Sequence, residues 1–259
     1  MLDAVPDRHL GLCSVTLRKL SVERVVEVAT RAGLGCIEWG ADVHAPPGDL
    51  ARLDEVRRRT EDAGLRVASY GSYWRAGVDD APQVRAVIEA TQRLGTQRAR
   101  IWAGAVASAH ADPLTRLRVV TATREAAEIA AGHGVSLSFE FHADTLTDNA
   151  QSTLNLLREV DRPSVSTYWQ PPNDVSDADA VHTLAQVLDA VSAVHVFSWW
   201  PATHRLPLVG RRDLWRGALD VLATRKPVDL LLEFVVDDNP DFVATEARAL
   251  RALTDGSVP

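Results

Sequence analysis

Cysteine is scarce in this sequence: Cys13 and Cys36 are the two cysteines among 259 residues. Two widely spaced cysteines make neither a disulfide framework nor a zinc knuckle, so we expect free thiols in a reducing compartment. The chain also lacks a basic and apolar leader and any apolar run near the ~20 residues that cross a bilayer. These absences predict a cytoplasmic protein with no membrane partner.

Basic charge is also limited, since 28 Lys and Arg stand against 35 Asp and Glu, for a net charge of −7. Nucleic-acid binding draws most of its free energy from basic side chains that neutralise phosphates, so no nucleic-acid partner is expected. A metal-dependent phosphodiesterase acting on DNA would in addition need more His and carboxylate ligands and a basic groove. The composition is 46% hydrophobic, which is enough for a large core.

No Gly-, Ser- or Pro-rich linker divides the chain, and strand-like runs alternate with helix-like runs eight times. This pattern predicts one α/β domain over residues 1–259, a single (β/α)₈ TIM barrel. A doubly wound open sheet is disfavoured, because HLGLCSVTLRKLS has one glycine where a dinucleotide fingerprint needs three. The predicted strands are 9–15, 35–40, 66–73, 98–104, 135–142, 164–170, 193–199 and 228–236. The predicted helices are 21–32, 49–63, 81–94, 113–132, 148–160, 177–191, 213–224 and 241–253.

Two predicted strands, VSLSFEFH and VDLLLEFVV, carry Glu140 and Glu233 near their ends within apolar runs. In such barrels the catalytic groups lie at the C-terminal ends of the strands. An isolated carboxylate in an apolar barrel would be desolvated, and its pKa would rise by up to ~3–5 units unless something compensated the charge. A divalent cation would do so, with His195 of the seventh strand as a nitrogen ligand.

A purely structural interpretation remains open at this point. The two glutamates could instead pair with arginines such as Arg66, Arg98 or Arg100, with His195 as a hydrogen-bonded core histidine. The metal interpretation is favoured because the three candidate ligands occupy equivalent positions on the fifth, seventh and eighth predicted strands.

Several segments together resemble the xylose-isomerase-like barrel superfamily of sugar isomerases and epimerases, which includes ketose 3-epimerases, hydroxypyruvate isomerase, inosose dehydratase and endonuclease IV. The resemblance covers nearly the whole chain. It is carried by GLGCIEWGADVH (34–44), RARIWAG (98–104), SLSFEFHADTLTDNAQSTLNLLREV (136–160), AVHVFSWWP (193–201), PLVGRRDLW (207–215) and LLLEF (230–234).

The resemblance implies four metal ligands, of which Glu140, His195 and Glu233 match the family pattern. The fourth position departs from the pattern, because TYWQPPND places Trp169 or Gln170 where the family usually has aspartate, and of these Gln170 can coordinate through its amide oxygen. An amide oxygen is a poorer ligand for a hard cation than a carboxylate. Mn²⁺ is the expected cofactor, with Mg²⁺, Co²⁺ or Zn²⁺ as alternatives, and a metal-free binding descendant remains an alternative.

The function implied by the resemblance is a metal-dependent isomerase or epimerase acting on a sugar or polyol ketone through an enediolate. Glu140 and Glu233 would be the catalytic acid and base, each contributing roughly 10²–10⁴-fold. The alternative is a lyase or dehydratase, including elimination of a C- or O-glycoside, at the same site. A small carbohydrate-like substrate is the expected partner, and a homodimer is left open. The candidate substrate-binding residues are His44, Trp102, His142, Trp169, Trp199 and Arg205.

Overall fold

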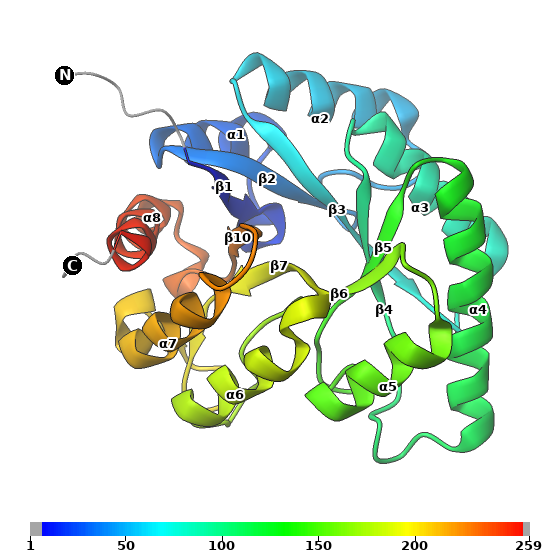
Figure 1. The fold of residues 1–259 in the computed structure, drawn as a ribbon. Coiled ribbons are helices and arrows are strands. Elements are labelled where there is room, and N and C mark those ends of the chain that lie inside the picture. The colour runs from blue at the N-terminus through cyan, green and yellow to red at the C-terminus, as the bar shows by residue number, and fades with distance from the viewer. Residues whose placement is uncertain (1–6, 256–259) are drawn as a thin grey trace.

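The computed structural model describes residues 7–255, and in these residues eight parallel strands close into a barrel, with helices around its outside (Figure 1). The predicted (β/α)₈ fold is therefore confirmed. Neighbouring strands pair in the ring order β1-β10-β7-β6-β5-β4-β3-β2. The strands are β1 (Asp7–Cys13), β2 (Leu34–Gly40), β3 (Arg66–Arg75), β4 (Arg98–Trp102), β5 (Ser136–Phe139), β6 (Val165–Trp169), β7 (Val191–Val196) and β10 (Asp229–Leu232).

The long loop after β7 contains a short antiparallel pair, β8 (Ser198–Trp199) and β9 (Arg205–Leu206). The α-helices are α1 (Val22–Arg31), α2 (Leu50–Asp62), α3 (Ala81–Arg93), α4 (Pro113–Gly132), α5 (Ala150–Val160), α6 (Asp177–Val187), α7 (Arg212–Leu222) and α8 (Pro240–Thr254). The 3₁₀ helices are η1 (Ser14–Leu17), η2 (Leu188–Ala190), η3 (Leu208–Arg211) and η4 (Val236–Asp238). No helix within residues 7–255 combines the length and apolar character of a membrane span.

Local sequence signals explain where most helices begin and end. Asp80, for example, accepts the backbone N–H of Gln83, whose side chain in turn accepts the Asp80 N–H, so two N-terminal donors of α3 are satisfied. Gly33 and Gly64 follow α1 and α2 with φ of 68° and 74°, a left-handed conformation that glycine adopts without a steric penalty. These capping residues and glycines therefore determine where most helices of the βα units begin and end.

Strands β5 and β10 end earlier than predicted, because the chain leaves the regular sheet at Glu140 and Glu233. One more backbone hydrogen bond follows each strand: the Glu140 N–H donates to Ile101 O, and the Glu233 N–H donates to Val196 O. Both carboxylates are therefore fixed at the C-terminal rim by backbone pairing to a neighbouring strand.

Successive side chains of a strand point to opposite faces of the sheet, so the buried residues form two separate hydrophobic clusters. One lies between strands and helices, and a smaller cluster fills the barrel itself. Because every second residue of a strand faces the same side, the residues two positions beyond this inner cluster also point inward. The inner cluster includes Cys36, Tyr168, Ala193 and Leu231, and the residues two positions later are Glu38, Gln170, His195 and Glu233.

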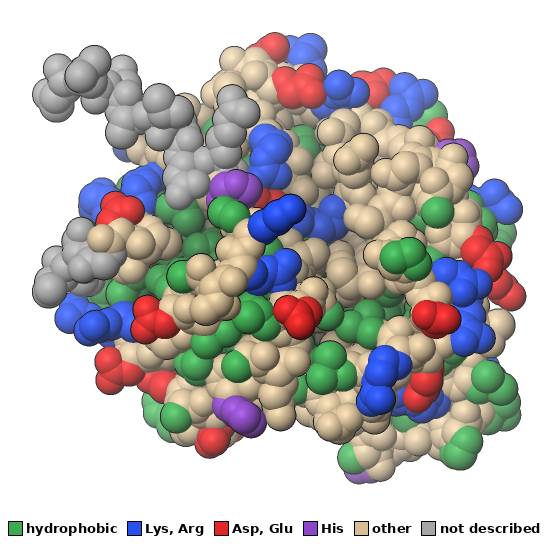
Figure 2. All heavy atoms as spheres, in the orientation of Figure 1, with side chains coloured by type: hydrophobic (Ala, Val, Ile, Leu, Met, Phe, Trp, Pro, Cys, Tyr) green, Lys and Arg blue, Asp and Glu red, His purple; other side chains and the backbone are tan. Residues whose placement is uncertain are grey.

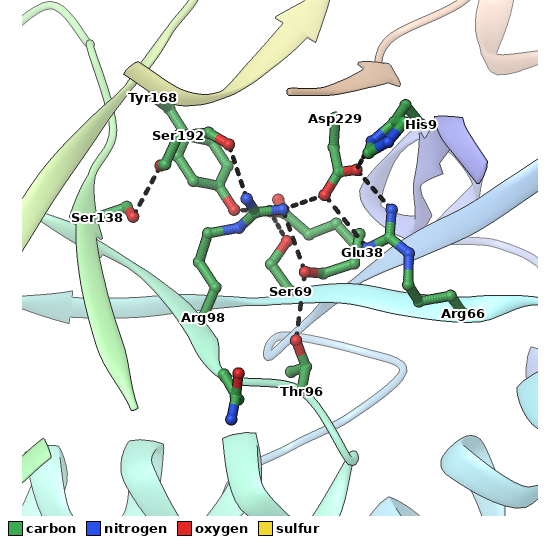
Figure 3. Close-up of polar contacts among 12 residues, drawn as sticks. His9, Glu38, Arg66, Ser69, Thr96, Arg98, Ser138, Tyr168, Ser192 and Asp229 are labelled. Atoms are coloured by element: carbon green, nitrogen blue, oxygen red, sulfur yellow. Dashed lines mark hydrogen bonds and ion pairs between the residues drawn. The ribbon is translucent and has the colours of Figure 1, made fainter. Parts of the chain in front are cut away.

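The N-terminal end of the barrel is closed by an ionic cluster around Asp229, which is 5% exposed. Arg66 and Arg98 donate to its carboxylate, and His9 Nδ1 lies 3.2 Å from Oδ1. Figure 3 shows these three side chains pointing at Asp229 from different strands. In the space-filling view, basic side chains gather near the centre of the molecular face (Figure 2). These ion pairs and hydrogen bonds around Asp229 therefore close the N-terminal end of the barrel.

Candidate active site

A cavity of about 610 Å³ lies at the C-terminal mouth of the barrel. Its position matches the rule that barrel enzymes bind substrates at this end. Six of the residues predicted from the sequence line this cavity: Glu140, Gln170, Glu233, Trp102, His142 and Trp199.

The four predicted metal ligands meet around one ring nitrogen of His195, which is fully buried. His195 Nδ1 lies 3.0 Å from Gln170 Oε1, 3.3 Å from Glu233 Oε2 and 3.8 Å from Glu140 Oε1. The structure therefore brings together side chains from the ends of four strands, β5, β6, β7 and β10.

These separations fit a shared cation. Ligand bonds of about 2.1 Å in tetrahedral or octahedral geometry place neighbouring ligand atoms about 3.0–3.4 Å apart. Two of the three distances from His195 Nδ1 fall in this interval, and Glu140 Oε1 is slightly farther away. Cys13 adds a further potential ligand, because Cys13, His195 and Glu233 offer atoms that all lie within 4.8 Å of one another.

Arg100 also reaches this site, and it is 3% exposed. Its Nη1 donates to Glu140 Oε2, and its Nε lies 3.7 Å from Glu38 Oε1. The arginine pairing considered from the sequence is thus present for Glu140. This pairing does not remove Glu140 from the cluster of candidate ligands, because the other carboxylate oxygen of Glu140 faces His195.

The charge of the buried groups is not balanced by Arg100 alone. Three carboxylates, those of Glu38, Glu140 and Glu233, are at most 6% exposed and surround a single guanidinium. The carboxylates outnumber the guanidinium, so carboxylate charges remain uncompensated at the floor of the cavity, which Glu140 and Glu233 line. A divalent cation would neutralise them, so the donor set fits such an ion in charge as well as in spacing.

Two pKa shifts follow from this environment. Burial raises the pKa of the Glu38 carboxyl, but interaction with His195 and Arg100 and a hydrogen bond from Ser69 outweigh burial and hold that pKa well below its ordinary range. Burial, together with the nearby Glu38 and Glu233 carboxylates, raises the pKa of the Cys13 thiol well above its ordinary value. Glu38 is therefore ionised at neutral pH, whereas Cys13 is a thiol in the absence of a cation.

Aromatic side chains form two walls of the cavity. On one side Trp102 packs between His142, at a ring-centroid distance of 4.5 Å, and Tyr73, at 6.4 Å. On the other side Trp199 packs against Phe234, at 5.1 Å, and Phe197, at 4.9 Å. Two walls of this kind suit a flat or cyclic ligand above a polar floor.

His142 has a defined hydrogen-bonding role on the first wall. Its Nδ1 lies 2.7 Å from the carbonyl oxygen of Ala143, and a carbonyl only accepts, so Nδ1 carries a proton. The remaining nitrogen, Nε2, can accept a proton or bind a substrate hydroxyl.

Three predicted substrate contacts are not among the residues that line the cavity. Trp169 points outward, because it is one residue away from the inward-facing Tyr168 and Gln170, and its indole N–H donates to Thr183. His44 is 1% exposed, and its ring nitrogens contact Ser14 Oγ and Leu20 O. Arg205 lies behind the second wall, where it pairs with Asp238 and covers Phe234 at 5.0 Å.

The structure adds site residues that had no assigned role in the sequence analysis. Glu38 showed the same signal as Glu140, a carboxylate near the end of an apolar strand (GCIEWG). Arg100 was considered only as a structural partner. Phe197 and Phe234 gave no signal, because aromatic residues in apolar strands are ordinary core residues.

A family model described as Xylose isomerase-like TIM barrel matches residues 26–220, and the chain belongs to this family. The resemblance found in the sequence is thereby confirmed.

Among curated proteins, the chain is similar to 3-dehydroshikimate dehydratase of Bacillus anthracis. The two are 27% identical over 204 residues, which cover 71% of this chain and 70% of the relative.

Solved structures give the same fold. The "probable 3-DHS dehydratase" involved in petrobactin synthesis in Bacillus anthracis superposes with a TM-score of 0.78 at 19% identity, over 93% of this chain and 98% of that chain. L-ribulose 3-epimerase superposes with a TM-score of 0.72 at 18% identity, over 95% and 96%. A Mycobacterium smegmatis barrel in complex with magnesium has a TM-score of 0.65 at 17% identity, over 93% and 92%.

Proposed function

We propose that this protein is a divalent-metal-dependent lyase that acts on a cyclic, polyhydroxylated ketone. It would remove the proton next to the carbonyl and expel a hydroxyl group from the adjacent carbon. The observation that carries the proposal is the convergence of Glu140, Gln170 and Glu233 on His195 Nδ1 at the floor of the cavity. The relative named as a 3-dehydroshikimate dehydratase supports this reaction class.

Glu140, Gln170, His195 and Glu233 would hold the cation, with Cys13 close enough to take part. Mn²⁺ is the proposed ion, since oxygen-rich sites with one imidazole suit it. When bound, such an ion polarises a carbonyl and stabilises the negative charge that develops on its oxygen. All other steps belong to the protein side chains.

Glu233 is the proposed base. The Arg100 guanidinium engages Glu140, whereas Glu233 Oε2 faces His195 Nδ1 at the cavity floor, so the role of base is assigned to Glu233. His142, as an imidazolium on the aromatic wall, would donate its Nε2 proton to the departing hydroxyl, which leaves as water, while Glu233 keeps the proton removed from the substrate. The two walls exclude water and hold the ring so that the α-proton faces the base.

An epimerase or isomerase is the second candidate, and the placement of the two glutamates favours it. Glu140 follows β5 and Glu233 follows β10, and β6 and β7 lie between these strands in the ring. Carboxylates separated in this way could remove a proton from one face of a ketose and return one to the other.

One experiment separates these reactions. The protein would be incubated with Mn²⁺ and 3-dehydroshikimate in D₂O, and in parallel with D-psicose. We expect the first probe to lose water and gain the ultraviolet absorbance of an aromatic acid. Deuterium retained in an isomerised ketose, without elimination, would favour the epimerase instead. A protein that binds no divalent ion and converts neither probe would contradict the proposal.

The substituted ligand position gives a direct prediction. Gln170→Asp adds a carboxylate where the chain has a neutral amide, so Mn²⁺ affinity should rise about tenfold or more. Titration of free Mn²⁺ by electron paramagnetic resonance would measure it. Asn173→Asp, a change at another residue that lines the cavity, is the matched control for added charge. Equal gains in both variants would show a general charge effect rather than a ligand.

A further inference from the structure

Glu38 lies in the barrel interior next to the proposed metal-binding residues, is 2% exposed, and is held by five polar neighbours. Its Oε2 accepts hydrogen bonds from Ser69 Oγ at 2.7 Å and from the Tyr168 hydroxyl at 2.9 Å. Its Oε1 lies 3.2 Å from His195 Nε2 and 3.7 Å from Arg100 Nε, and it accepts a hydrogen bond from the Cys13 thiol at 3.8 Å. One oxygen is therefore occupied by hydroxyl donors, and the other faces the imidazole.

This arrangement determines which ring nitrogen of His195 carries a proton. An ionised carboxylate only accepts hydrogen bonds, so Nε2 must be the donor toward Glu38. Nδ1 faces three acceptors, Gln170 Oε1 and the Glu140 and Glu233 carboxylates, so Nδ1 is the nitrogen that would offer its lone pair to a cation held by these groups, while Nε2 keeps its proton toward Glu38. Nδ1 is thereby oriented as a ligand.

We infer that Glu38 is a positioning residue of the metal site, because it fixes the His195 tautomer that presents the Nδ1 lone pair to a divalent cation. The inference rests on the proposed function. A carboxylate behind a ligating histidine also raises the basicity of the ligand. This contribution has particular weight here, because the amide of Gln170 stands where a fourth charged ligand would otherwise bind.

The barrel core holds Glu38 in place independently of the cavity. Tyr168 belongs to the inner cluster, and the Arg98 guanidinium lies 5.6 Å from its ring. Arg98 also forms an ion pair with Asp229 at the N-terminal end of the barrel. Figure 3 shows Glu38, Ser69, Tyr168 and Arg98 pointing toward one another in the barrel interior. The contacts that orient Glu38 thus belong to the packed interior and not to the substrate.

The test compares Mn²⁺ binding to the full chain and to Glu38→Gln by electron paramagnetic resonance. We expect a 10–100-fold loss of affinity, the effect typical of removing such a partner. Glu246→Gln is the matched control, since Glu246 is 5% exposed but accepts the Leu208 N–H outside the site. Tyr168→Phe keeps the Glu38 charge and removes one of its donors. It should weaken binding less than Glu38→Gln, and it provides a second measurement if Glu38→Gln does not fold.

Nitrogen-15 NMR of histidine-labelled protein without metal reads the proton positions directly. We expect His195 Nε2 to be protonated in the wild type, with this signature lost or mixed in Glu38→Gln. The His195 signal is identified by its loss in His195→Asn. An unprotonated Nε2 in the wild type, or Mn²⁺ affinity in Glu38→Gln equal to that of the wild type, would overturn the inference. Wild-type protein that binds no Mn²⁺ would instead overturn the proposed function, whereas the NMR result would still decide the role of Glu38.

Discussion

Replacing Glu233 or Glu140 with glutamine is expected to lower kcat by about 10²–10⁴-fold for the substrate that the protein turns over, while the fold is retained. Glutamine fills the same volume but neither carries the charge nor accepts the substrate proton. Both side chains line the cavity and contact His195 through a carboxylate oxygen. Steady-state kinetics with saturating Mn²⁺ would measure the loss.

The two variants are expected to differ in stability. Glu233→Gln should unfold at nearly the wild-type temperature, because the Glu233 carboxylate pairs with the His195 imidazole and not with a buried guanidinium. Glu140→Gln removes the carboxylate that Arg100 pairs with, leaving that guanidinium with Glu38, so its melting temperature should fall further. Glu246→Gln again serves as the control with a buried glutamate outside the site. Wild-type kcat in both site variants would exclude their catalytic role.

The second large effect is expected at the opposite end of the barrel. Asp229→Asn should lower the free energy of unfolding by about 3 kcal/mol, because it leaves the largely buried Arg98 without its carboxylate partner. The ion pair with Arg66 contributes less, since that side chain is 40% exposed. Urea denaturation at pH 7 would measure the difference.

The effect of Asp229→Asn should depend on pH. Burial raises the pKa of the Asp229 carboxyl, but hydrogen bonds and charges from Arg66 and Arg98 lower it overall below its ordinary 3.8. A depressed pKa in the folded state contributes stability above the ordinary pKa, and this stability is lost as the pH falls through the folded value. The difference between wild type and Asp229→Asn should therefore shrink below about pH 4.

Two observations would contradict this account of the ionic cluster. The first is an equal loss of stability in Asp62→Asn, whose pair with Arg58 lies at the surface with side chains 66% and 61% exposed. The second is a difference from wild type that stays constant between pH 7 and pH 3. Either result would show that the cluster at the N-terminal end does not act through the Asp229 charge.

Most of the fold could be predicted because its signals are local. Asp80 caps α3 through its own side chain, and Gly33 ends a βα unit through its own backbone conformation. Such signals need no distant partner. The predicted ends of the strands were less accurate. Glu140 and Glu233 leave the regular sheet but each keeps one backbone hydrogen bond to the neighbouring strand.

The residue pattern was sufficient to predict that Glu140, His195 and Glu233 lie near one another. Each stands near the C-terminal end of a strand, and in a closed parallel barrel all such ends share one rim. Gln170 was assigned to the same cluster through the family resemblance, because it follows the sixth strand where the family has aspartate. Trp102 ends β4 and His142 comes three residues after β5, and both residues line the cavity.

Only the tertiary structure decided which side chains became partners across the barrel. Arg100 could have met any carboxylate at the rim, and the closure and stagger of the strands place it between Glu140 and Glu38. The same closure brings Glu38 of β2 to His195 of β7, across 157 positions of sequence. Local patterns record which way a side chain faces along its own strand, but contacts across the interior depend on how all eight strands are arranged around the ring.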